Sequence, residues 1–357
     1  MNDKMPVEIR PFFSAYDKNQ SRFEQIKKFV MFAKEQKPFV QKMESHGKND
    51  GFIEILKSLS NSVVLYNAVI ISIYGSFECY VDDIVGIYID YLKTQSPEYN
   101  MLPENVKAKN LIKSAEYISN PHRFLNYGLT VELVIQALEN TINNNLSSAM
   151  HNELLKAHGG NMKTDQLNDL LKDCGIENGI QRISKHKGFE TKCHELEASF
   201  AEIDLNGLTL NPLNQIVEER NKIAHGWVVD DRISFSMLMN KHIPFIESFC
   251  EAIKDLFVSV VIQKYMDNNL IFSFGPILKL WGNGTIVGIN NGDFKLKVNE
   301  YLFYSTPDNW NYMFKIENLK NNNENRNTIR ARNKDIAILA DRKLKTNYRI
   351  WGYKRED

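Results

Sequence analysis

The sequence predicts a mainly α-helical protein that is followed by a small β-rich module. Up to about residue 268, apolar side chains recur at helical spacing over long segments. From residue 271 onward, short alternating segments are separated by turns rich in Gly and Asn. We therefore expect a helical domain over residues 1–270 and a β-barrel-like or curled-sheet domain over residues 271–357. A chain of 357 residues is long enough to give both a substantial core.

The helical pattern is clearest at two places. Phe23, Ile26, Val30 and Ala33 share one face of a predicted amphipathic helix over residues 23–36. Residues 61–92 form a long apolar segment, which predicts a central buried helix or two joined helices. Further helices are expected over residues 104–118, 131–143, 213–225 and 244–266.

The β-rich module is indicated by a hairpin signal. Gly282-Asn283-Gly284 separates apolar segments over residues 277–281 and 285–289, and such a turn is typical of antiparallel strands. Short strands at this spacing favour a small barrel or a curled sheet. Further strands are expected over residues 294–298, 312–316, 337–340 and 348–353.

Charge is distributed unevenly although the formal net charge is zero. Residues 271–357 hold 15 Lys and Arg against 9 Asp and Glu, which leaves 29 against 35 for the remainder. A basic module on an acidic body indicates either an anionic partner such as RNA or a docking surface between the halves. Ordinary solvated charge is the other interpretation. Aromatic residues near the end, including Tyr348 and Trp351, either stack on bases or fill the barrel core.

Cysteine usage and hydropathy bear on location. The four cysteines form no Cys-x-x-Cys pair and have no zinc-like spacing with His, so we expect buried thiols, a reducing compartment and no bound metal or cofactor. No signal peptide is evident at the N-terminus, and no segment is expected to span a membrane. The sequence thus predicts a cytoplasmic protein.

The segment Arg220-Asn221-Lys222-Ile223-Ala224-His225-Gly226 carries the clearest chemical signal. Arginine keeps its charge and binds phosphate through two N–H groups. Histidine titrates near neutral pH and therefore transfers protons. Together these side chains suffice to cleave RNA without a metal. Gly226 is expected to end the helix and to leave the imidazole near its C-terminus.

Two interpretations of this segment stay open on spacing alone. On an ideal helix, Arg220 lies on an apolar stripe with Ile216 and Ile223, where a cation is costly unless an anion meets it. A phosphate would meet that need. A carboxylate such as Glu78 would meet it equally well, in which case Arg220 is structural and His225 only caps the helix.

The Arg-x4-His spacing, ending in Ile-Ala-His-Gly, resembles the signature of the HEPN superfamily. Two upstream stretches are similar to its RiboL-PSP branch. The first runs from Ser72 to Val85 and contains Glu78. The second runs from Gly159 to Lys163 and continues as Leu-Asn-Asp-Leu-Leu over residues 167–171. The resemblance covers roughly residues 55–265.

The resemblance implies an all-helical domain that dimerises and cleaves RNA without metal. Arg220 would bind the scissile phosphate and His225 would take part in proton transfer as the 2′-hydroxyl attacks. The products would be a 2′,3′-cyclic phosphate and a 5′-hydroxyl. Asn221 would orient the imidazole or contact phosphate. Glu78 is a candidate to interact with Arg220 and hold it in place without touching the substrate, and Glu219 is a weaker candidate for the same role.

The family also implies a biological setting. Its nucleases are effectors of prokaryotic antiviral defence or toxins, held inactive by a regulatory partner. One mode of control, modification of a tyrosine two residues after the histidine, is not expected because Trp227 occupies that position. The alternative function is a non-catalytic HEPN dimer that acts as a scaffold or binds nucleotides or RNA. The intact Arg220, Asn221 and His225 favour the enzyme.

Overall fold

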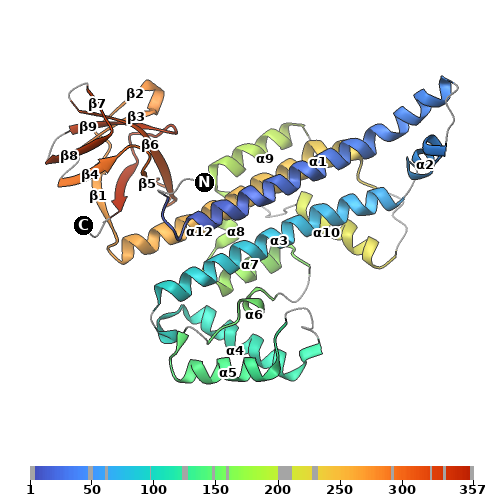
Figure 1. Cartoon of the computed structure of the whole chain (residues 1–357), viewed down its shortest axis with the longest axis horizontal. Helices are drawn as coiled ribbons and strands as arrows, with labels where there is room; N and C mark the ends of the chain where they lie inside the picture. The colour runs from blue at the N-terminus through green and yellow to red at the C-terminus, as the bar shows by residue number, and fades with distance from the viewer. Residues whose placement is uncertain are drawn as a thin grey trace. The chain divides into compact units, whose positions relative to one another are not determined.

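The chain folds into two compact units (Figure 1), here in a computed structural model. Ser14–Lys254 form a helical unit. Asp255–Asp357, joined by Met1–Phe13, form a unit built around a β-sheet. Because helix α12 crosses residue 255, the last part of that helix belongs to the sheet-containing unit. The structure describes residues 5–46, 51–60, 63–96, 98–122, 128–146, 149–157, 161–199, 211–226, 232–290, 293–321, 324–332 and 335–353.

The predicted helices are present and others join them. The long apolar segment is one helix rather than two, and the amphipathic segment at 23–36 lies within a helix of 36 residues. A single π-helical turn, Leu238–His242, precedes the last helix. The helices are α1 Arg10–Ser45, α2 Gly51–Ser60, α3 Val63–Gln95, α4 Glu104–Ser119, α5 Val131–Ile142, α6 Asn152–Lys156, α7 Thr164–Asp173, α8 Gly179–Ser184, α9 Lys187–Ser199, α10 Asn211–Ala224, α11 Phe235–Met237 and α12 Ile243–Asp267.

Helix α3 is the centre of the helical unit. Phe77 is fully buried and stacks on Phe249 of α12, with ring centroids 6.0 Å apart. Phe189 of α9 packs against the same Phe249 at 5.4 Å. The Tyr80 hydroxyl donates to the Cys250 carbonyl at 2.8 Å, so the polar tip of a buried aromatic is satisfied. These contacts pack α3 against α12, which is distant in the sequence, and α9 against the same part of α12.

Two features of this helix were not expected from the sequence. Helix α3 is long and apolar enough to span a membrane, judged by length and composition alone. Many of its apolar residues are buried inside the protein, which is the reason that a core helix passes the same test. Cys79 is exposed, unlike the other three cysteines, because it lines an open groove of about 560 Å³ between α1 and α3.

The sheet-containing unit is antiparallel throughout its described strand pairs. The main sheet has the order β1-β10-β5-β6-β9-β3-β2, β7 pairs with β6, and β4 and β8 form a separate ribbon. Strands β1, β5, β7 and β8 were not predicted. The strands are β1 Ile271–Pro276, β2 Lys279–Trp281, β3 Ile286–Asn290, β4 Asp293–Lys297, β5 Tyr301–Ser305, β6 Asn311–Asn321, β7 Glu324–Arg326, β8 Thr328–Arg332, β9 Asp335–Ala340 and β10 Arg349–Tyr353.

The sheet curls around one apolar core, which confirms the predicted barrel-like or curled-sheet class. Its register shifts between Ser273 and Gly275 and between Ile316 and Asn318, and such bulges bend a sheet. The predicted hairpin turn is present, with Asn283 at a φ of 58° between β2 and β3. Val287 and Ile338, paired across β3 and β9, are both fully buried in the core.

Candidate functional site

The Arg-x4-His segment lies at the C-terminal end of α10. The helix ends at Ala224, and Gly226 adopts a φ of 71°, where a residue without a Cβ is unstrained. The His225 and Gly226 amides still donate to the carbonyls of Asn221 and Ile223. The exposed His225 therefore follows directly on the last helical turn, as the sequence predicted. Trp227 lies outside the described residues.

Arg220 is held by amides and an aromatic ring. Its Nη1 donates to Asn161 Oδ1 at 2.6 Å and to Asn221 Oδ1 at 3.3 Å. The guanidinium carbon lies 5.0 Å from the centre of the Tyr74 ring, within the range of a cation–π contact. These three partners come from different parts of the helical unit: α3, the segment before α7, and α10 itself.

No carboxylate neutralises Arg220 within the described part of the chain. Asn161 and Asn221 are neutral, and a half-buried cation without a counter-charge favours an anion beside it. The structural alternative, an ion pair with Glu78, is not what the structure has. Instead Glu78 Oε1 accepts a hydrogen bond at 2.7 Å from the Tyr74 hydroxyl, and that hydroxyl accepts from the Met162 amide at 3.0 Å. Glu78 is thus connected to Arg220 only indirectly: it binds the hydroxyl of Tyr74, and the ring of Tyr74 contacts the guanidinium.

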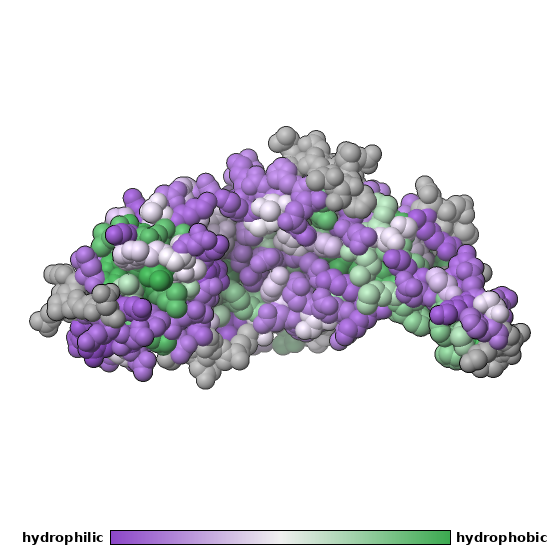
Figure 2. Space-filling model, turned by 90° about the horizontal axis from the view of Figure 1, so that it is seen from above, coloured by the Kyte–Doolittle hydropathy of each residue, from purple (hydrophilic) through white to green (hydrophobic). Residues whose placement is uncertain are grey.

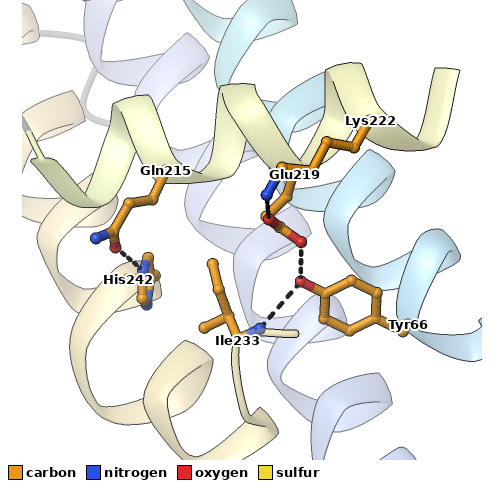
Figure 3. Close-up of polar contacts among 6 residues, drawn as sticks. All are labelled: Tyr66, Gln215, Glu219, Lys222, Ile233 and His242. Carbon is orange, nitrogen blue, oxygen red and sulfur yellow. Dashed lines mark hydrogen bonds and ion pairs between the residues drawn. The ribbon is translucent and has the colours of Figure 1, made fainter. Parts of the chain in front are cut away.

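Glu219, the neighbour of Arg220, serves the packing of α10 (Figure 3). This buried carboxylate accepts from the Tyr66 hydroxyl of α3 at 2.6 Å and pairs with Lys222 at 2.7 Å. The same hydroxyl accepts from the Ile233 amide at 3.2 Å. Burial, followed by the hydrogen bond to Glu219, raises the pKa of Tyr66 well above its usual range, so the phenol keeps its proton. The partners of Glu219 are therefore Tyr66 and Lys222 rather than Arg220.

A second polar contact holds α10 one turn earlier. His242, fully buried in the π-helical turn, places Nε2 2.8 Å from the side-chain oxygen of Gln215 and Nδ1 3.2 Å from the Met237 carbonyl. Burial lowers the pKa of His242 to about 4. The hydrogen bond with the Met237 carbonyl favours the protonated imidazole, but its effect on the pKa is smaller than that of burial. The imidazole is thus neutral at pH 7. Gln215 and Glu219 are four residues apart, so one face of α10 carries both contacts.

The sequence located the helix that carries Arg220 and His225, and it missed two partners of Arg220. Tyr74 and Asn161 touch Arg220 directly, yet neither was predicted as a site residue. The spacing of four between Tyr74 and Glu78 would have indicated that they share a helix face. No sequence signal joins Asn161 to Arg220 across 59 residues. Asn221 contacts Arg220 as well, and its predicted role beside His225 stays a prediction.

The fold and the Arg-x4-His segment together indicate the class of protein. An all-helical unit in which Arg-x4-His ends a core helix is the arrangement expected of a HEPN domain. The family model for RiboL-PSP-HEPN matches residues 17–259, and the chain belongs to this family. The family has nuclease or RNA-related roles. No curated protein and no solved structure matches the chain significantly.

The buried histidine makes the stability of the helical unit depend on pH. Because the folded pKa of His242 is about 4 and the unfolded value is near 6.5, the unfolded chain binds more protons between these values. Stability from this group is complete above pH 6.5 and falls as the pH drops toward 4. We expect a loss of about 2 kcal/mol at pH 5 relative to pH 7.5.

Urea unfolding of wild-type and His242→Gln protein at both pH values tests this. The variant should be less stable at pH 7.5 but should lose about 2 kcal/mol less on acidification. His194→Gln, which changes an exposed histidine of α9, is the matched control and should follow the wild type. Equal pH dependence of all three proteins would contradict the neutral buried imidazole.

Proposed function

We propose that the protein is a metal-independent endoribonuclease with Arg220 and His225 as its catalytic residues. The observation that carries the proposal is the uncompensated guanidinium of Arg220, five positions before an exposed imidazole on the same helix end. A phosphate group supplies the charge that no described carboxylate supplies. RNA is the substrate because its 2′-hydroxyl provides the nucleophile within the chain that is cut.

The chemistry follows from these two groups. An imidazole removes the proton from the 2′-hydroxyl, and the 2′-oxygen attacks the adjacent phosphorus. A bond forms between that oxygen and phosphorus while the bond from phosphorus to the 5′-oxygen breaks. A protonated imidazole gives the leaving oxygen its proton. Arg220 binds the phosphoryl oxygens and stabilises their negative charge as it grows. The products are a 2′,3′-cyclic phosphate and a 5′-hydroxyl.

Tyr74, Glu78 and Asn161 are positioning residues in this proposal. Tyr74 supports one face of the guanidinium, and its hydroxyl is fixed between Glu78 and the Met162 amide. Asn161 accepts from one Nη of Arg220 and adds no charge. Arg220 is therefore held in one orientation and keeps its full positive charge for the substrate. A carboxylate in place of Asn161 would neutralise it.

We further propose that two copies pair so that both Arg-x4-His segments serve one groove. One copy offers one imidazole, whereas the reaction needs both a base and an acid. The chain also has apolar surface for a partner. Val64 and Ile71 of α3 are 67% and 51% exposed, and Figure 2 shows hydrophobic areas among the hydrophilic ones. Exposed apolar patches commonly mark interaction sites. On α1 and α2 the exposed apolar residues include Phe32, Phe39, Phe52 and Ile55.

The biological role is proposed on the family's associations alone. A nuclease that cuts cellular RNA harms its host unless it is restrained. An effector of antiviral defence or a toxin, acting in the cytoplasm and held by a regulatory protein, meets that requirement.

Arg220→Ala and His225→Ala should each lower RNA cleavage by at least about 100-fold, because they remove charge stabilisation and proton transfer, respectively. Single-turnover cleavage of a mixed RNA pool measures the rates, and EDTA should leave the wild-type rate unchanged. Arg182→Ala on α8 and His194→Ala are matched controls and should cleave normally. Cleavage by either site variant at the wild-type rate would overturn the assignment. Inactivity of the wild type on every RNA would favour the scaffold.

Tyr74→Phe should lower the cleavage rate by about 10-fold, because the ring still faces Arg220 but loses its two hydrogen bonds. The effect should appear in the rate constant at saturating RNA rather than in RNA affinity. Tyr80→Phe is the matched control, since it removes a similar hydroxyl from the same helix, one that donates to the Cys250 carbonyl of α12 rather than to α10. A larger loss for Tyr80→Phe than for Tyr74→Phe would contradict the positioning role.

Dimerisation should be required for activity. Light scattering should give a mass near twice 41.4 kDa at working concentration. Specific activity should fall on dilution below the dissociation constant, because single copies lack the second imidazole. Val64→Lys together with Ile71→Lys should lower both dimer content and activity, while the same change at Leu111 and Ile112, exposed on α4, should alter neither. A stable monomer that retains full activity would sink the composite site.

A further inference from the structure

The ribbon formed by β4 and β8 has one apolar face and one basic face. In its register Phe294 pairs with Ala331 and Leu296 with Ile329, and Leu296 and Ile329 are buried in the core of the sheet-containing unit. Side chains alternate between faces along a strand. The intervening pairs of the register therefore lie on the outward face: Asp293 with Arg332, Lys295 with Arg330, and Lys297 with Thr328.

The outward face places like charges against each other. Lys295 and Arg330 are directly opposite and exposed, and Lys297 follows two residues along the same face. Residues directly opposite in an antiparallel pair lie about 5 Å apart at Cβ, where like charges are destabilising. The side chains of Lys295, Lys297 and Arg330 make no ion pair or hydrogen bond with another described residue, and only the Lys297 backbone amide donates to a carboxylate, that of Glu300, at 3.2 Å. Among the side chains that the structure describes on this face, the charged ones are thus three cations on two neighbouring strands.

Two other cations of this unit have a carboxylate partner. Arg326 of β7 pairs with Glu324, and Arg342 pairs with Asp341. On the outward face of the β4–β8 ribbon, by contrast, the described charged side chains are all positive and lie beside one another. Such a concentration of one sign selects an extended anion.

We propose that the basic face of the β4–β8 ribbon binds the phosphate backbone of RNA. The choice of RNA as the polyanion rests on the proposed function. Three ammonium and guanidinium groups with the Thr328 hydroxyl supply donors for several consecutive phosphates, and the described residues of this face include no aromatic side chain to stack on bases. The ribbon therefore binds RNA irrespective of base sequence and raises the local RNA concentration for the enzyme.

Fluorescence anisotropy with a labelled 12-nucleotide RNA, measured over a series of salt concentrations, tests the proposal. The full-length protein carries His225→Ala so that the probe stays intact. Against this background, the triple variant Lys295→Gln, Lys297→Gln and Arg330→Gln is compared with a matched triple variant. The matched variant, Lys320→Gln, Lys343→Gln and Arg349→Gln, removes the same charge from exposed positions elsewhere in the unit.

The ribbon variant should weaken RNA binding by tens of fold at 0.1 M salt. The slope of log K against log salt should become shallower by about two, since single-stranded nucleic acid contributes about 0.7 per phosphate contact. The matched variant should keep the slope of its parent. An unchanged slope in the ribbon variant, or an equal change in the matched variant, would overturn the proposal. So would failure to bind RNA combined with ribbon-dependent binding of polyglutamate, which would assign the face to an acidic protein.

This binding test is independent of cleavage. If the wild type cleaves no RNA but the ribbon variant shows the expected change in slope, the nuclease proposal fails and the binding surface stands. If cleavage depends on Arg220 and His225 while the slope is unchanged, the reverse holds. Circular dichroism of both triple variants checks that the sheet is intact.

Discussion

The position of α10 depends on buried polar contacts on one face of that helix. Glu219 accepts from Tyr66 of α3, and Gln215 faces the neutral imidazole of His242. An unsatisfied buried carboxylate or imidazole is costly, so each pair stabilises one rotational setting of the helix. Apolar packing of Ile216 and Val217 alone would allow more freedom, since it has no direction. With α10 held this way, Arg220 meets the ring of Tyr74.

Two adjacent residues of α10 differ in how their charge is treated: the charge of Glu219 is neutralised, whereas that of Arg220 has no described counter-charge. Glu219 is buried and has a hydroxyl and the Lys222 ammonium as partners. Arg220 has amide oxygens and an aromatic face, which orient it without cancelling its charge. A neutralised guanidinium would attract phosphate weakly, whereas an oriented and uncompensated one is ready for an anion. In our proposal the contrast separates a packing role of Glu219 from a chemical role of the next residue, Arg220.

The two units divide the work in our proposals. The helical unit holds the reactive groups on a rigid helix, which keeps their geometry accurate. The sheet-containing unit offers an outward face of unneutralised cations, and phosphate contacts of that kind add affinity without reading sequence. A nuclease built in this way would depend on its reaction chemistry for the choice of RNA over DNA. Its ribbon would set how binding responds to salt.

The sequence by itself determined the local features of this protein. Helical periodicity located the helices around Phe23, Ile73 and Phe249, and Gly226 marked the end of α10, because these features depend on neighbouring residues. The Arg-x4-His spacing likewise indicated the family and the pair that we propose to be catalytic. Strand β8 was not found, since its identity depends on pairing with β4 rather than on its own composition. Only the tertiary structure decided that Asn161 and Tyr74, rather than Glu78, contact Arg220, because contacts between residues far apart in sequence arise from the packing of whole helices.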